Sequence, residues 1–113
     1  MRRLSLLLIA LAVQTSVAMA KEVDICVAES EVEDGVKITT TGLVLEIAKC
    51  PDSPKTCLDI ESVEEDIDYC IVGVYPKGKI PSACKVGRTA TVTGMVKGFM
   101  GFNDLHDAKI SCR

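Results

Sequence analysis

The chain has 113 residues, 48% of them hydrophobic and 26% charged, and its sixteen acidic and thirteen basic side chains give a net charge of −3. This length suits one domain, whose core would be marginal without covalent staples. The acidic balance argues against a nucleic-acid partner, because binding to polyphosphates requires clustered lysine and arginine.

The first twenty residues have the pattern of a secretory signal peptide. Arg2 and Arg3 precede an apolar run over residues 4–13, and residues 18–20, Ala-Met-Ala, form a small-x-small cleavage site. The run is too short to span a bilayer. We therefore expect cleavage after residue 20, a mature domain over residues 21–113 with a net charge of −5, no transmembrane anchor, and export to the periplasm or secretion.

The mature chain has the pattern of an all-β domain, because Val, Ile and Thr alternate with polar residues and Gly or Pro interrupts the runs. Residues 21–34 allow either a short strand at 23–28 or a helical lead-in. Residues 76–87 are too short and too rich in Pro and Gly for more than a helical turn. We predict five strands, at residues 36–49, 56–63, 69–75, 89–99 and 108–112.

The first predicted strand changes its apolar parity halfway along. Its apolar positions share one parity up to Thr40 and the other parity from Leu43 onward. One extra residue in a strand has this effect, and glycine is its usual occupant, so we expect a bulge at Thr41-Gly42. A long strand that bends at a bulge allows a small sheet to close. The pattern therefore favours a five-stranded OB-like barrel, with a β-sandwich as the alternative.

The stretch from Lys85 to Cys112, KVGRTATVTGMVKGFMGFNDLHDAKISC, contains V-x-G-x-V-x-G-F and a final L-x-[DN]-x-x-I. The residues that carry this pattern are Gly87, Val92, Gly94, Val96, Gly98, Phe99, Leu105, Asp107 and Ile110. The stretch resembles the closing half of small bacterial OB-fold domains described as tRNA anticodon-like, or as exported domains of unknown function. The resemblance implies an OB-like barrel. The description also implies nucleic-acid binding, from which this chain departs in its acidity, its predicted export and its few aromatic residues.

Six cysteines follow the predicted cleavage site: Cys26, Cys50, Cys57, Cys70, Cys84 and Cys112. An even count in an exported chain predicts three structural disulfides. Cys50 and Cys57 bracket a turn-forming stretch, so a local bridge between them is expected. The other four allow three pairings, among which we favour Cys70–Cys84 with Cys26–Cys112, the latter joining both ends of the mature chain.

The sequence contains no recognisable catalytic or metal-binding pattern. It has no C-x-x-C, and its cysteine spacings are too wide for a zinc site. Met95, Met100 and His106 are too scattered for a copper motif. His106, the single histidine, is expected in a surface turn, with no nucleophile-elbow motif beside it. The acidic run at residues 61–68 lacks the glycine and spacing of a calcium loop and is expected to be a solvated turn. We expect no enzyme activity, no metal and no cofactor.

OB barrels bind ligands across their second and third strands and the adjoining loops. Tyr69 and Tyr75 border that face, and Phe99, Met100 and Phe102 gather in the expected loop after the fourth strand. These five are the candidate binding residues. The favoured interpretation of the three loop residues is that they fold back and plug the open barrel end. The alternative is an exposed contact surface.

Two functions fit these features. One is a non-enzymatic binding module for a protein, a glycan or a small ligand, which a pocket between the second and third strands would favour. The other is a structural or accessory envelope protein that docks on a larger partner through the apolar loop, which exposure of that loop would favour. The size, predicted export and cysteine count also resemble the glycan-binding ring subunits of toxins. Residues 76–87, however, cannot supply the long helix that lines such rings.

Overall fold

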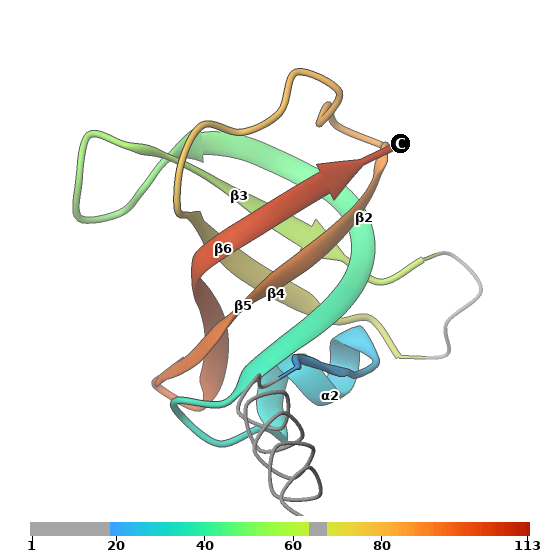
Figure 1. The fold of residues 1–113 in the computed structure, drawn as a ribbon, viewed down its shortest axis with the longest axis vertical. Coiled ribbons are helices and arrows are strands. Elements are labelled where there is room, and N and C mark those ends of the chain that lie inside the picture. The colour runs from blue at the N-terminus through green and yellow to red at the C-terminus, as the bar shows by residue number, and fades with distance from the viewer. Residues whose placement is uncertain (1–18, 64–67) are drawn as a thin grey trace, which may run out of the picture.

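The computed structural model describes residues 19–63 and 68–113 (Figure 1). The predicted leader up to residue 18 and the middle of the predicted acidic turn, residues 64–67, lie outside the described residues, so cleavage after residue 20 stays a prediction. The described elements are β1 (Lys21–Glu22), α2 (Ile25–Ser30), β2 (Lys37–Lys49), β3 (Thr56–Glu61), β4 (Ile71–Pro76), β5 (Thr89–Phe99) and β6 (Phe102–Cys112). The five predicted strands are confirmed, and the last of them is longer than expected.

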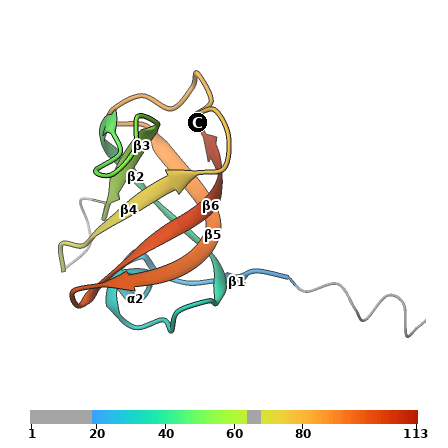
Figure 2. The same ribbon diagram turned by 90° about the vertical axis from the view of Figure 1, so that its left-hand side faces the viewer.

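The sheet closes into a five-stranded barrel of the OB-like type. Its strand order is β2–β3–β4–β6–β5, and β5 pairs back onto β2. The β4–β6 pair is parallel, whereas the other barrel pairs are antiparallel. The short β1 adds in parallel to β2 outside the barrel. Figure 2 shows the strands crossing the barrel at a steep tilt, as closure of a small sheet requires.

β2 bends so that it can serve both sides of the closed sheet. Leu43 is the pivot, because it pairs with Thr89 of β5 and also with Glu61 of β3. The predicted long first strand that curls into a barrel is therefore confirmed. Every second residue of β2 from Ile38 to Val44 faces the core, which is the side-chain alternation of a strand with one buried face.

The predicted bulge at Thr41-Gly42 is wrong. The inward parity continues through Gly42 to Val44, and the irregularity lies one step later, between Val44 and Glu46. Gly42 serves close packing instead. A Cβ built there would lie 2.6 Å from the carbonyl oxygen of Glu61, so only glycine allows β3 to approach. The predicted change of parity would have turned Leu43 and Leu45 toward the core. Both are only half-buried, and Val44 between them is the buried core residue.

The helix α2 closes one end of the barrel, in agreement with the helical alternative for residues 21–34. Asp24 caps it by accepting a hydrogen bond from the backbone N–H of Cys26 at 2.9 Å. Ile25 and Ala28 on its inner side are buried in the barrel core. The Asn103 side chain of β6 donates hydrogen bonds to the carbonyl oxygens of Ala28 and Val32, at 3.1 and 3.0 Å, which ties the end of the helix to the sheet.

Three disulfides staple the barrel, as expected, but only one predicted pair is confirmed. The bridges are Cys26–Cys70, Cys50–Cys57 and Cys84–Cys112, with Cα–Cα distances of 5.3, 4.9 and 5.1 Å. The favoured pairs Cys70–Cys84 and Cys26–Cys112 are wrong. Cys70 precedes β4 at the α2 end, whereas Cys84 lies in the β4–β5 connection at the opposite end, where β6 finishes. Bridges therefore form within each end and not between the two.

The disulfides indicate an oxidising, extracellular-type environment. Within residues 19–63 and 68–113, no helix has the length and apolar character needed to cross a membrane.

Candidate functional site

The β5–β6 connection is a two-residue turn and not the longer loop that we expected. Met100 and Gly101 both have positive φ, 52° and 89°, which is the pattern of a type I′ hairpin turn. Phe99 and Phe102 form the last cross-strand pair beside it. Strand pairing therefore continues almost to the tip, and for this reason β6 begins at Phe102 instead of Ala108.

Phe99, Met100 and Phe102, here called the hairpin tip, are exposed. Their exposed fractions are 70, 82 and 61%. The interpretation that they plug the barrel is wrong, since Ile25 and Ala28 of α2 already fill the neighbouring end. The alternative, an exposed apolar surface, is what the structure shows.

The hairpin tip is held firmly by the segment that follows α2. The carboxylate of Asp34 accepts a hydrogen bond from the backbone N–H of Gly98 at 2.7 Å. On the other strand, Asn103 anchors the backbone next to Phe102 through its bonds to α2. The three apolar side chains therefore project from a braced hairpin.

The outer face of β6 continues from the hairpin tip into the barrel wall. His106, expected in a surface turn, instead lies within β6, and its ring stacks on that of Tyr75 with a centroid distance of 4.2 Å. Burial raises the pKa of Tyr75, and the carboxylates of Asp104, Asp52 and Asp59 add to this. The pair forms a flat aromatic surface on the face where OB barrels bind ligands.

Tyr69 stands apart from this pair. It precedes β4 at the α2 end, whereas Tyr75 lies near the far end of the same strand. Its hydroxyl donates a hydrogen bond to the Glu61 carboxylate at 2.6 Å, and that bond raises the pKa of Tyr69. The structure therefore brings Tyr75 together with His106, but not with Tyr69.

Two carboxylates face each other across Gly73 on the same outer wall. Asp59 of β3 and Asp104 of β6 are both register partners of Gly73, and a Cβ at Gly73 would lie 2.6 Å from Oδ1 of Asp104. Burial raises the pKa of Asp59, helped by the charges of Glu46 and Asp104. Burial also raises the pKa of Asp104, opposed by His106 and by a hydrogen bond from the Gly73 backbone.

This wall is acidic, but no group of three or more His, Cys, Asp or Glu side chains among the described residues is arranged to hold a metal ion. The hollow on this side of the barrel, of about 230 Å³, lies between β2 and β3 and not between β3 and β4, where a ligand pocket was expected. It is lined by Glu46, Ala48, Lys49, Pro51, Cys57, Leu58 and Asp59.

A larger cleft, of about 740 Å³, lies at the barrel end opposite α2. It is lined by Ile47, Lys55, Thr56, Pro76, Lys77, Gly78, Lys79, Ile80, Pro81, Ser82, Cys84 and Lys85. This cleft was not predicted from the sequence. A usable signal was present, because residues 69–103 contain five basic side chains and no acidic one in an otherwise acidic chain.

The fold and the bridges define this chain as a small OB-like barrel stapled by three disulfides. Comparison with protein-family models and with curated proteins found no match.

Proposed function

We propose that this protein is an exported, non-enzymatic binding module that recognises a partner protein through the hairpin tip. The observation that carries the proposal is the exposure of Phe99, Met100 and Phe102 together on one braced turn. Large aromatic and methionine side chains are enriched at the centres of protein interfaces, where they supply much of the binding energy. A single exposed apolar residue would need no such explanation, but three on one turn do.

The bracing of the turn supports recognition. The bonds from Gly98 to Asp34, and from Asn103 to α2, restrict the hairpin before any partner arrives. Binding then costs less ordering entropy, and more of the apolar burial is realised as affinity.

The charges beside the hairpin tip are of both signs. Asp104 follows Phe102 on the outer face of β6, and the exposed Lys97 of β5 is its cross-strand partner. A complementary partner offers an apolar pocket with polar and charged side chains of both signs at its rim, since such groups guide the encounter and select the partner.

The same exposed hairpin favours a second candidate, an accessory envelope protein that docks on a larger assembly. The two candidates differ in the size of the complex and not in the surface used. We also propose, from the resemblance of residues 85–112 alone, that the chain is related to small exported bacterial OB-fold domains, which agrees with either role. Neither candidate assigns catalysis, and the stacked rings of His106 and Tyr75 are a second surface that a ligand could contact.

Site-specific photo-crosslinking in the producing cells tests the proposal. A photoreactive residue at position 100 is expected to give a discrete protein adduct, whereas the same residue at position 86 gives none. Val86 is the matched control, because it is a large exposed apolar residue outside the hairpin. An adduct that migrates within a large assembly would select the accessory role. No adduct from position 100, or the same adducts from both positions, would overturn the proposal.

A further inference from the structure

The 740 Å³ cleft lies at the end of the barrel opposite α2, where the connection between β4 and β5 arches over the opening (Figures 1 and 2). One wall is the β2–β3 loop with Lys55, and the other is the connection with Lys77, Lys79 and Lys85. The volume is within the range of about 300–1,000 Å³ that is typical of small-molecule sites.

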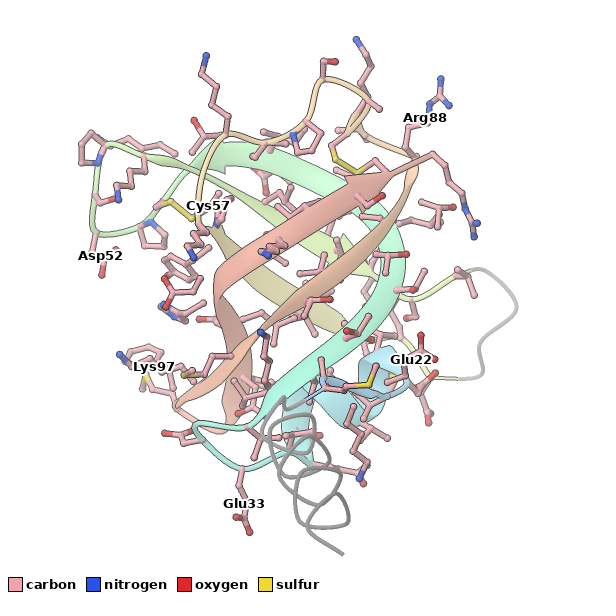
Figure 3. The ribbon with its side chains drawn as sticks, viewed as in Figure 1. Glu22, Glu33, Asp52, Cys57, Arg88 and Lys97 are labelled. Carbon is pink, nitrogen blue, oxygen red and sulfur yellow. A yellow bond between two sulfur atoms is a disulfide. The ribbon has the colours of Figure 1, made fainter. Side chains whose placement is uncertain are left out.

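The cleft is a positive region in an acidic protein. Four lysines line it, and no carboxylate is among its lining residues. Figure 3 shows Arg88 at this end of the barrel and Asp52 on the β2–β3 loop, outside the lining of the cleft, while Glu22 and Glu33 lie toward the α2 end. Like charges gathered in a concave surface focus the field and raise the local concentration of anions.

Apolar side chains also line the cleft. Ile47 is 37% exposed, and Ile80 packs against the core with one side. Pro76 and Pro81 are further apolar residues of the lining. An inorganic anion would leave this surface in contact with water, whereas a molecule with a hydrocarbon body would cover it.

Both walls are fixed in place. The Cys50–Cys57 bridge closes the loop that carries Lys55, and the carbonyl of Lys55 accepts a hydrogen bond from the backbone N–H of Cys50 at 2.8 Å. Cys84, which lines the cleft, is bridged to Cys112 of β6. The backbone N–H of Lys77 also donates to the carbonyl of Ala108 at 2.9 Å. The cleft is therefore a preformed feature of the fold.

We propose that this cleft binds an anionic amphiphile, meaning a molecule with a carboxylate, sulfate or phosphate head on a short hydrocarbon body. The lysines contact the head and the isoleucines contact the body. Lysine acts as a flexible point charge and does not impose the fixed two-pronged geometry of arginine, so the cleft accepts any of these heads. This site is separate from the hairpin tip and does not depend on the proposed function.

Calorimetry on the disulfide-bonded protein recovered from the producing cells tests the proposal, with octyl sulfate below its micelle concentration as the probe. We expect saturable binding of one molecule, weaker binding as salt is raised, and little binding of neutral octyl glucoside or of inorganic sulfate. Equal binding of octyl sulfate and octyl glucoside, or the absence of saturation, would overturn it.

Two variants locate the site. K77Q/K79Q is expected to weaken octyl sulfate binding about tenfold, which corresponds to about 1.4 kcal/mol, because two of the four lysine charges are removed. The matched control is K37Q/K97Q, which removes the same charge from exposed positions outside the cleft and is expected to leave binding unchanged. A similar loss in both double variants would show nonspecific charge attraction and would refute the proposal.

The apolar part of the site has its own variant. I47S is expected to weaken octyl sulfate binding several-fold, because part of the hydrocarbon contact is lost. An unchanged octyl sulfate affinity would contradict the binding of an amphiphile.

Vesicles distinguish the two sources of such a head group, a membrane lipid and a free ligand. Co-sedimentation with phosphatidylglycerol vesicles but not with phosphatidylcholine vesicles identifies a membrane lipid, whereas octyl sulfate binding without co-sedimentation identifies a free ligand.

Discussion

Asp59 shows how a single residue on the acidic wall lowers the stability of the folded state. Its carboxyl is half-buried, lies near the charges of Glu46 and Asp104, and has a raised pKa. The folded protein therefore holds this proton more tightly than the unfolded chain does. For a carboxyl of this kind, stability is lost as the pH rises from below the ordinary value of about 3.8 through the raised pKa, and the cost is fully present at neutral pH.

Replacing this carboxyl is expected to relieve the cost. Asp59→Asn should be more stable than the wild type at pH 7, by less than about 1 kcal/mol because solvent screens a half-exposed group. The difference in stability between Asp59→Asn and the wild type should shrink toward pH 3, where the side chain at position 59 is neutral in both proteins. Urea unfolding at pH 3, 5 and 7 measures this, with Glu33→Gln, an exposed carboxylate, as the control. A variant equally less stable at every pH would contradict the assignment.

At the scale of one element, the turn of the β5–β6 hairpin carries a residue that lowers the stability of the turn. Met100 occupies the left-handed region, which costs a side chain such as methionine about 1 kcal/mol or more. Asparagine or glycine is the usual residue at this position of a type I′ turn. The presence of an exposed methionine at this position supports the proposal that its side chain contacts a partner protein.

Met100→Asn is therefore expected to stabilise the domain by about 0.5–1 kcal/mol while removing an apolar contact from the hairpin tip. Equilibrium unfolding in denaturant should show a higher midpoint with an unchanged slope. Met95→Asn provides the control, because Met95 is also exposed but lies within β5, where asparagine is unfavourable. A loss of stability in both variants would show that the turn conformation is not the cause.

At the scale of the whole molecule, the disulfides at the two ends of the barrel should contribute different amounts to the free energy of unfolding. Cys26–Cys70 joins residues 44 apart in the sequence, and Cys50–Cys57 joins residues 7 apart. Closing a longer loop removes more entropy from the unfolded chain, so the first bridge should stabilise the domain more.

Removing each bridge by paired substitution with serine tests this order. We expect a loss of about 4 kcal/mol for Cys26→Ser/Cys70→Ser and about 2.4 kcal/mol for Cys50→Ser/Cys57→Ser, from the loop-entropy relation. Guanidinium unfolding of the two variants beside the wild type gives both values. If the short bridge contributed as much as the long one, interactions of the native β2–β3 loop, and not the entropy of the unfolded chain, would set the order.

The features that the sequence predicted are those that depend on neighbours along the chain. Alternation placed the strands, and the turn-forming stretch between Cys50 and Cys57 indicated their bridge, because both depend on short-range geometry. The tertiary structure decided the rest. Barrel closure places Cys70 beside Cys26 and brings Gly42 into close contact with β3. It also places His106 within a strand, where its ring stacks on that of Tyr75. It also gathered Lys55 with lysines from a distant segment into one cleft. These contacts join residues far apart in the chain, so no local pattern specifies them, and only the closed sheet brings them together.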